Sequence, residues 1–305
     1  LEGTASGSNG FNSTGASINL QSITRNRSFV LGGIGSEYHL TRNTELYANF
    51  SQAYRPIQFA NLQAPPTTDL VDPDLKDAKG YNIDLGYRGR VKDYLFFDVS
   101  GFILQYNNRI GVIAQQKVDG SFYNFRTNVG NSQSKGVEAL VEFSPTKAWM
   151  KNSTIGHLTF FSSIAIIQAR YANFNIISRQ GNQLVENSLH DKKVENAPNN
   201  IIRTGLTYTK KAFTFTTQYS YVSEAFSDAN NSRTATSSGV NGPIPVYKLV
   251  DVSGTYKFNE KFFVKGGVNN LLNEKYFTRR ATGYPGPGLL PGDGRTFFVS
   301  LGGRF

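Results

Sequence analysis

The side chains of this chain that can do chemistry are few, and they do not form a catalytic set. Cysteine is absent, and the three histidines are His39, His157 and His190. These histidines lie too far apart in the sequence to match the short spacings of metal-ligating histidines. A nucleophile such as Ser253 has no histidine on the strands predicted beside it, so a nucleophile triad lacks its base. We therefore predict that the protein is not an enzyme and holds no resident metal or cofactor.

The positive charge of the chain points to an anion rather than to a nucleic acid. Lysine and arginine together number 32 against 22 acidic residues, a net charge of +10. A nucleic-acid site concentrates basic residues in one patch with stacking aromatics, whereas here they occur in short scattered runs such as Lys210-Lys211 and Arg279-Arg280. Each run can be a solvated turn, or it can raise the local concentration of an anionic ligand. We expect no nucleic-acid partner.

The last residues show what kind of element must position such groups. Phe297, Val299, Leu301, Gly303 and Phe305 alternate with Thr296, Phe298, Ser300, Gly302 and Arg304. The first set is apolar or small, and the second is mostly polar or small with Phe298 as its apolar exception. This pattern predicts a strand with one apolar face. An ordinary sheet strand and the closing strand of an outer-membrane β-barrel both have it.

The same two-residue period recurs throughout the chain. It is clearest over Tyr81–Arg88, Val137–Phe143, Ile202–Tyr208, Phe213–Tyr221 and Tyr247–Phe258, and we count about eleven strands in all. No run approaches the roughly 18 apolar residues of a spanning helix. Phe and Tyr are abundant, 23 and 16 residues, as expected of strands and of aromatic girdles at a membrane interface. The pattern predicts an all-β, antiparallel architecture.

The predicted connections alternate between short and long. The short ones lie near Thr41–Thr44, Gly89–Asp93, Pro145–Ser153, Thr209–Ala212 and Asn259–Glu260. The long ones lie near Pro56–Lys76, Ala114–Phe125, Tyr171–Asn196, Phe226–Pro245 and Thr278–Gly292. Outer-membrane barrels have short periplasmic turns at one rim and longer extracellular loops at the other. A soluble β-sandwich has no reason to sort its loops in this way, so the alternation favours a transmembrane antiparallel β-barrel.

An odd number of strands predicts a part of a larger barrel. Bacterial single-chain barrels have an even number of strands, and an open sheet in lipid would leave two edges unpaired. Twice eleven is about 22, the size of plugged outer-membrane transporters. We therefore expect residues 1–305 to be the C-terminal part of such a barrel, with the plug domain and the first strands absent. Residues 1–26 are then expected to form an extracellular loop, and Phe305 to lie at the periplasmic rim.

Several segments resemble, in order and spacing, blocks of the TonB-dependent outer-membrane receptors. The segments that carry the resemblance are Tyr47-Ala-Asn-Phe-Ser-Gln-Ala-Tyr-Arg-Pro56, Asp84-Leu-Gly-Tyr-Arg88, Phe96-Phe-Asp-Val-Ser-Gly-Phe102, Asn107-Asn-Arg-Ile110, Asn128-Val-Gly130, Gly136-Val-Glu138, Asn196-Ala-Pro198, Asn269-Asn-Leu-Leu-Asn-Glu-Lys-Tyr-Phe277 and Gly294-Arg-Thr-Phe-Phe298. The resemblance runs from about Ser28 to Phe305, and the block over Asn269–Phe277 is its most specific part.

The resemblance implies active transport across the bacterial outer membrane. A ligand would bind at the cell surface, and TonB would supply energy through an N-terminal segment that this chain lacks. The family's commonest ligands are iron(III) chelates, with cobalamin, haem and glycans among the others. The implied partners are TonB, an iron(III) chelate and outer-membrane lipids. Two other classes stay open from the residues alone: a barrel porin or enzyme, and a soluble β-rich adhesin or lectin.

The same resemblance suggests which residues meet the ligand. The stretch Ala53-Tyr-Arg-Pro-Ile-Gln-Phe59 resembles receptors for ferric citrate-type chelates. An anionic chelate needs cationic and hydrogen-bonding groups in an open cleft, so the candidates are Arg55, Gln58, Arg279 and Arg280. The alternative is that Arg55 only orders the end of its strand and that Arg279 and Arg280 are solvated.

Aromatic loop residues and one histidine are weaker candidates. Phe59, Phe174 and Phe226 could stack on an aromatic siderophore, but such residues more often pack the base of a loop. His190 lies in a long predicted loop and could ligate haem iron, although no second axial candidate lies nearby in the sequence.

Overall fold

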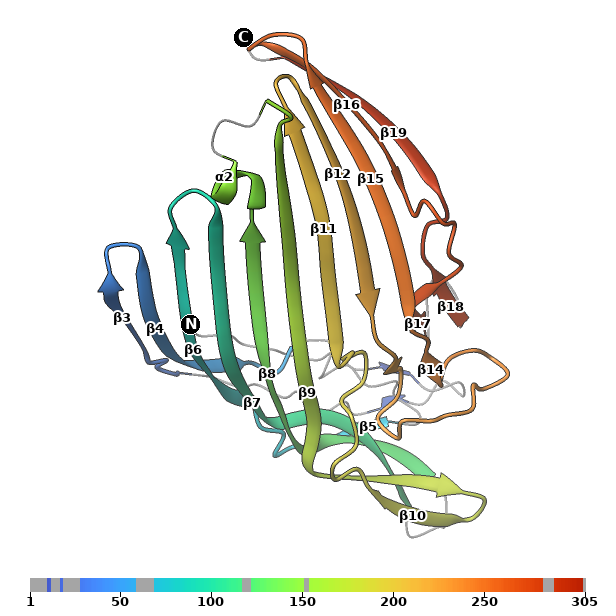
Figure 1. Cartoon of the computed structure of the whole chain (residues 1–305). Helices are drawn as coiled ribbons and strands as arrows, with labels where there is room; N and C mark the ends of the chain where they lie inside the picture. The colour runs from blue at the N-terminus through green and yellow to red at the C-terminus, as the bar shows by residue number, and fades with distance from the viewer. Residues whose placement is uncertain are drawn as a thin grey trace.

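The computed structural model consists of one wall of long antiparallel strands (Figure 1). It describes residues 10–11, 17–18, 28–58, 69–116, 122–150, 154–281 and 288–303. Eleven strands lie side by side in the order of the chain: β3 (Gly33–Thr41), β4 (Thr44–Arg55), β6 (Ala78–Val91), β7 (Leu95–Gln116), β8 (Phe122–Phe143), β9 (His157–Gln180), β11 (Asn200–Lys210), β12 (Phe213–Val222), β15 (Tyr247–Lys257), β16 (Phe262–Asn269) and β19 (Thr296–Gly303). The predicted all-β architecture and strand number are confirmed.

Shorter elements pair with this wall or lie next to its strands in the sequence. β5 (Asp69–Val71) pairs in parallel with β8, and β10 (Gln183–Ser188) pairs with β9. Three two-stranded pairs stand apart: β1 (Gly10–Phe11) with β2 (Ser17–Ile18), β13 (Ala225–Phe226) with β14 (Pro243–Ile244), and β17 (Phe277–Ala281) with β18 (Gly288–Pro291). The helix α2 (Pro145–Trp149) lies between β8 and β9. Among the described residues, helices of the length and apolarity that a membrane crossing requires do not occur.

The two faces of the wall differ in the way that the alternation predicts. On β19, the side chains of Phe297, Val299 and Leu301 are 74%, 77% and 82% exposed. Val268 on β16 lies opposite Phe297, and Val252 on β15 lies opposite Val268, so all of these share one face. This outer face is an exposed apolar band, which is the surface that a barrel presents to lipid.

The opposite, inner face carries polar side chains and a repeated pairing of an aromatic ring with a glycine. Each ring lies directly across from a glycine of the next strand: Tyr47 with Gly86, Phe102 with Gly136, Phe161 with Gly205, Phe298 with Gly267 and Phe263 with Gly302. A Cβ added at any of these glycines would lie within 3.0 Å of the ring. The rings therefore lie over the glycines, which explains why Phe298 departs from the polar pattern of its face.

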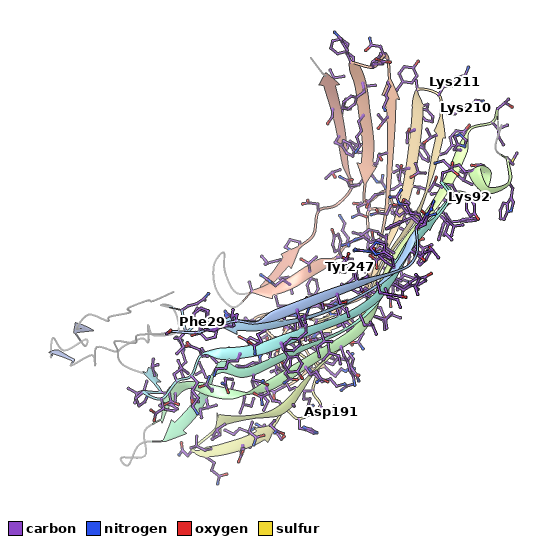
Figure 2. All side chains as sticks on the ribbon, turned by 90° about the vertical axis from the view of Figure 1, so that its left-hand side faces the viewer. Phe29, Lys92, Asp191, Lys210, Lys211 and Tyr247 are labelled. Carbon is purple, nitrogen blue, oxygen red and sulfur yellow. The ribbon has the colours of Figure 1, made fainter. Side chains whose placement is uncertain are left out.

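The predicted alternation of loop lengths is confirmed for most connections, with the exceptions of those between β7 and β8 and between β8 and β9. Turns of two to four residues join β3 to β4, β6 to β7, β11 to β12 and β15 to β16. These turns lie at one rim, the short-turn rim, which carries Lys92, Lys210 and Lys211 in Figure 2. The connections that contain β5, β13, β14, β17 and β18 lie at the other, the long-loop rim (Figure 1).

The structure corrects four of the predicted boundaries. The loops predicted over Ala114–Phe125 and Tyr171–Asn196 are largely strand, because β7, β8 and β9 extend for 22 to 24 residues and β10 pairs with β9. The short connection predicted over Pro145–Ser153 is longer than expected and contains α2. The strand predicted from Lys261 to Tyr276 ends at Asn269, because the next residue, Asn270, has a φ of 50° and leaves the ladder.

Some predictions fall outside the described residues. Within the extracellular loop predicted over residues 1–26, the structure describes only β1 and β2. Phe59 and Phe305 also lie outside the described part of the chain. β19 ends at Gly303, opposite Phe262 at the short-turn rim, so the direction of this strand agrees with the prediction.

The ring-over-glycine pairing predicts opposite effects at two adjacent glycines. A Cβ at Gly267 would lie 2.6 Å from the carbonyl oxygen of Val252 and 2.7 Å from the ring of Phe298. A Cβ at Gly266, on the outer face, would meet nothing closer than 3.5 Å. We expect Gly267→Ala to destabilise the intact protein by about 1–3 kcal/mol through overpacking, and Gly266→Ala to be neutral or slightly stabilising. Urea unfolding in detergent micelles measures both, and equal effects would contradict the pairing.

Candidate ligand-binding site

The wall bends where β7 and β8 leave the regular ladder. The pairing shifts register between Tyr106 and Arg109, and Asn108 has a φ of 58°. Asn128 holds this bulge, because its amide nitrogen donates to the carbonyl oxygens of Asn108 and Lys76, both at 2.9 Å. Asparagine suits both positions. At Asn108 it tolerates the positive φ, and at Asn128 its side chain bonds to nearby backbone. Beyond the bulge, the strands turn away from the axis of the wall (Figure 1).

The bulge brings a cationic side chain onto the inner face. Arg109 lines a pocket of about 300 Å³. The other lining residues are Arg55, Leu104, Tyr106, Ile110, Ser132, Ser134 and Val194. The Arg109 guanidinium lies over the rings of Tyr106 and Tyr171, 5.2 and 5.3 Å from their centroids. It also donates to Ser132 Oγ at 3.2 Å, so it is held from several sides.

The charge of Arg109 is partly compensated by Glu195. The distance from Arg109 Nη2 to Glu195 Oε1 is 3.7 Å, and Glu195 also accepts a hydrogen bond from the Tyr171 hydroxyl. Tyr171 belongs to a small buried cluster with Val129, Phe174 and Leu189, which packs the base of the extended strands. Arg109 is therefore a rigid, half-buried member of the pocket.

Arg55 is the exposed cation of the same pocket. It ends β4, and its Nη1 lies 3.5 Å from the Tyr106 hydroxyl oxygen. Within the described ranges, no carboxylate forms an ion pair with it. Its neighbour Tyr54, which bonds to Asp77 and stacks on Phe29, is the residue that orders the strand end. Gln58 is exposed three residues further on.

Arg279 and Arg280 lie in a different place from Arg55 and have different surroundings from each other. Both are on β17, which follows β16, whereas Arg55 is on β4, and seven strands of the wall lie between β16 and β4. Arg280 donates to the carbonyl oxygens of Gly239 and Pro243, at 2.8 Å each, and thus ties two long loops together. The Arg279 side chain is exposed, and its guanidinium makes no hydrogen bond or ion pair with the part of the chain that the structure describes.

A buried asparagine organises the loop that carries these two arginines. Asn270 is 3% exposed. Its backbone N–H donates to Asp251 Oδ1 at 2.7 Å, and its side-chain amide donates to the carbonyl oxygens of Glu274 and Asp293 at 2.9 and 3.0 Å. Its Oδ1 accepts from the Glu274 N–H at 2.8 Å. Burial also raises the pKa of the Tyr276 hydroxyl in the same loop. These bonds explain the asparagine at position 270 within the block over Asn269–Phe277.

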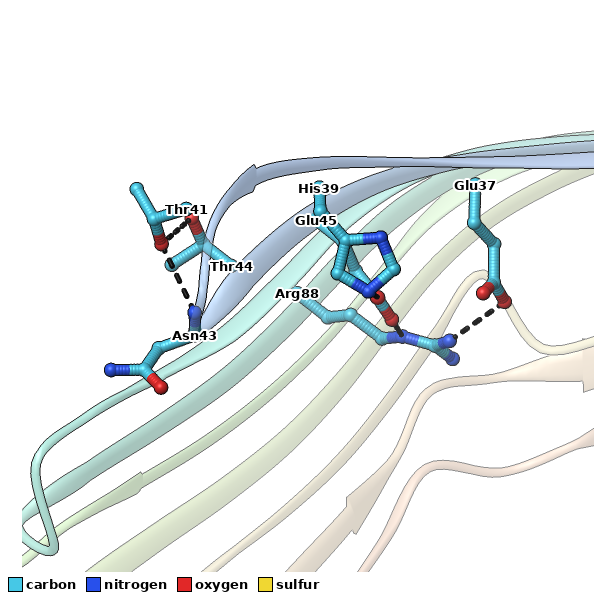
Figure 3. Close-up of polar contacts among 7 residues, drawn as sticks. All are labelled: Glu37, His39, Thr41, Asn43, Thr44, Glu45 and Arg88. Carbon is cyan, nitrogen blue, oxygen red and sulfur yellow. Dashed lines mark hydrogen bonds and ion pairs between the residues drawn. The ribbon is translucent and has the colours of Figure 1, made fainter.

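Near the short-turn rim, the inner face carries a compensated charge cluster (Figure 3). Arg88 on β6 pairs with Glu45 on β4 and, at 3.0 Å, with Glu37 on β3. His39 Nε2 lies 3.0 Å from Glu45 Oε2. The guanidinium of Arg88 has two carboxylate partners, whereas that of Arg55 has a phenol. The inner face thus carries a neutralised arginine near the short-turn rim and, at Arg55, an arginine with no described carboxylate partner near the long-loop rim.

The remaining residues suggested by the sequence, Phe174, Phe226 and His190, contact other parts of the protein. Phe174 and Phe226 are 7% and 3% exposed and pack the loop bases. His190 is exposed, and its Nδ1 lies 3.0 Å from the carbonyl oxygen of Ala172. Among the described residues, no group of three or more His, Cys, Asp or Glu could hold a metal ion.

Sequence reasoning did not select Arg109 and Tyr106 as site residues. The signal was present in Asn107-Asn-Arg-Ile110, where two asparagines precede an arginine inside a strand. Paired asparagines in a strand indicate a bulge, and a bulge re-aims the next side chain.

Comparisons with known proteins agree with this architecture. Residues 3–271 match the family model described as TonB dependent receptor-like, beta-barrel. The fold is similar to the ferric citrate transporter FecA in its unliganded form, with a TM-score of 0.71 and 19% identity over 96% of this chain and 40% of FecA. The siderophore receptor PiuA from Acinetobacter baumannii gives a TM-score of 0.71 and 17% identity, over 96% of this chain and 38% of PiuA.

A third similar structure is the ferric-catecholate import receptor Fiu from K12 E. coli. Its TM-score is 0.67 and its identity 18%, over 99% of this chain and 40% of Fiu. Identities this low establish the fold alone. The chain spans 38–40% of the length of these three structures.

The hydrogen bonds of Asn270 predict how the long loop opens. Asn270→Gly keeps a residue that tolerates positive φ and removes three side-chain bonds, so we expect amides of residues 271–281 to exchange about tenfold faster or more in the intact protein. Asn270→Ala adds backbone strain and should exchange faster still. Hydrogen-exchange mass spectrometry measures this, with the amides of β15 as the internal control. Unchanged protection in Asn270→Gly would show that these bonds do not hold the loop.

Proposed function

Because this chain belongs to the family of TonB-dependent receptor β-barrels, we propose that the intact protein is an active-transport receptor for an iron(III) chelate. The protein lies in the bacterial outer membrane, with the apolar outer face of the wall toward lipid. The chelate, of siderophore or citrate type, binds at the cell surface. TonB supplies the energy for import by contacting a segment N-terminal to this chain. The protein is a transport receptor and not an enzyme.

The ligands of similar structures support this class of ligand. FecA is a ferric citrate transporter, PiuA a siderophore receptor and Fiu a ferric-catecholate import receptor. Another, at a TM-score of 0.62, is a ferric enterobactin receptor mutant from Pseudomonas aeruginosa in complex with enterobactin. Shared fold does not fix the ligand, so the proposal for this chain rests on its own side chains.

The observation that carries the proposal is the exposed guanidinium of Arg55 at the pocket with Tyr106 and Arg109. Long loops face the cell exterior in outer-membrane barrels, and this pocket lies on the inner face where β4 ends and the long-loop connection begins. Arginine binds carboxylates through parallel N–H donors. A chelate that carries carboxylate groups therefore fits Arg55, with the phenol of Tyr106 as a further hydrogen-bond partner.

The pocket has two arginines, of which one is paired with a carboxylate. Glu195 compensates Arg109, which leaves Arg55 as the cation available to an incoming ligand. Gln58 is exposed beyond the end of the same strand, and we propose it as a neutral hydrogen-bonding contact. Arg279 is proposed as an outer contact that raises the local concentration of the anion. Arg280, whose donors bind two loop carbonyl oxygens, is proposed to position that loop.

Replacing Arg55 tests the ligand site. In the intact receptor, we expect Arg55→Ala to weaken binding of ferric citrate by about tenfold or more, the range for a lost hydrogen bond to a charged group. Arg42→Ala removes the same charge from an exposed turn at the short-turn rim and should leave affinity unchanged. Calorimetry on the purified receptor measures both. Equal affinities for Arg55→Ala and the unaltered receptor would remove Arg55 from the site.

Growth on single iron sources tests the ligand class separately. A strain that lacks the receptor should lose growth on ferric citrate or on one class of ferric siderophore, and the intact gene should restore it. Growth of the deletion strain on every iron chelate tested would contradict an iron ligand. That result would leave a cobalamin, haem or glycan receptor of the same family.

A further inference from the structure

The connection between β8 and β9 differs from the other connections at the short-turn rim. It covers residues 144–156 and contains α2, whereas the other turns have two to four residues. It is firmly attached: the Leu158 N–H donates to Thr146 Oγ1 at 2.9 Å, and the Ser144 hydroxyl lies 2.7 Å from that of Thr159. The Ser144 N–H also donates to the carbonyl oxygen of Tyr94 at 2.7 Å. These bonds tie the beginning of the connection, including the first turn of α2, to β9 and to the turn before β7.

This connection exposes large apolar side chains. Trp149 is 76% exposed, Met150 48% and Ile155 58%. Trp149 packs edge-on against Phe143, with ring centroids 5.6 Å apart, and Tyr94 also packs edge-on against this ring. Phe143 shares the face of Val137 and Val141 on β8, so the exposed patch continues the apolar outer band. α2 projects sideways beyond the turn that carries Lys92 (Figure 2).

The same rim is strongly basic. Its described turns and strand ends carry Arg42, Lys92, Lys147, Lys210, Lys211, Lys257 and Lys261, against the acidic residues Asp93 and Glu260. Lys147 belongs to α2, and its Nζ lies 3.5 Å from the carbonyl oxygen of Asp93. Lys147 therefore reaches the turn that carries Lys92, and Tyr94 of that turn packs against Phe143, as Trp149 does.

We propose that α2 is an interfacial membrane anchor with an anionic-phospholipid site beside it. Trp149, Met150 and Ile155 insert at the headgroup boundary of the periplasmic leaflet, and Lys92 and Lys147 bind the phosphate of an anionic headgroup. Tryptophan prefers this boundary because one end of its ring system is apolar and the other is wet. Lysines next to a membrane surface attract anionic lipids. The short-turn rim faces the periplasm in outer-membrane barrels, which places the anchor in that leaflet.

A spin label at Met150 tests the depth of the anchor. The chain has no cysteine, so Met150→Cys offers one labelling position within it, after any cysteine elsewhere in the intact receptor has been replaced. In vesicles of phosphatidylethanolamine and phosphatidylglycerol, we expect the label to collide more with oxygen than with a water-soluble nickel chelate. Ser237→Cys, in an exposed long loop, should show the reverse. A label at position 150 that is as accessible to nickel as one at position 237 would overturn the anchor.

Charge variants test the headgroup site. We expect Lys92→Gln combined with Lys147→Gln to lower the preference of the receptor for spin-labelled phosphatidylglycerol over phosphatidylethanolamine by about twofold or more. Lys92→Arg with Lys147→Arg should keep the preference, and Lys257→Gln with Lys261→Gln, on the rim away from α2, should lower it less. Heat-modifiable gel mobility checks that each variant is folded. An unchanged preference in the first double variant would overturn the site, and an equal loss in the last would show a diffuse charge effect only.

Discussion

The structure depends on one constraint: inside a lipid bilayer every backbone N–H and C=O must find a partner in the protein. A continuous antiparallel ladder from β3 to β19 meets this constraint between its two edges. Once the ladder is fixed, the two-residue period assigns each side chain to lipid or to the interior. Val252 and Phe297 then belong to the outer face, and Ser253 to the inner one. The aromatic rings of the inner face lie over cross-strand glycines such as Gly267, which lets a polar interior hold large rings without breaking the ladder.

Where the chain leaves the ladder, asparagine side chains take over the hydrogen bonding. Asn128 bonds the bulge of β7, and Asn270 bonds the loop after β16. Both sets of bonds help to position an arginine. The first directs Arg109 into the pocket beside Arg55, and the second supports the strand pair that carries Arg280. The regular wall thus resides in the membrane, and the candidate ligand contacts lie where regularity ends.

The regular part of this architecture was predictable from the sequence, because the faces and the alternation of loop lengths follow from local patterns. The rest depends on contacts that sequence spacing does not encode. The strand that begins near Lys261 was predicted to run to about Tyr276, and the buried bonds of Asn270 show where β16 ends. Arg55 was correctly placed at a strand end, but the partners of Arg280 lie in another loop, about 40 residues earlier. Arg109 was missed as a site residue because its direction depends on the bulge.

The central claim is that lipid contacts one face of this wall and an aqueous or protein interior contacts the other. Val252 and Ser253 are neighbours in the middle of β15, and the claim places them on opposite faces. Urea unfolding of the intact receptor in a bilayer-mimetic environment measures the difference most directly. Val252→Arg should destabilise the receptor by about 2–4 kcal/mol, the cost of arginine on a lipid face near the midplane, and Ser253→Arg should cost much less. Equal losses at the two positions, or a larger loss at Ser253, would contradict the account.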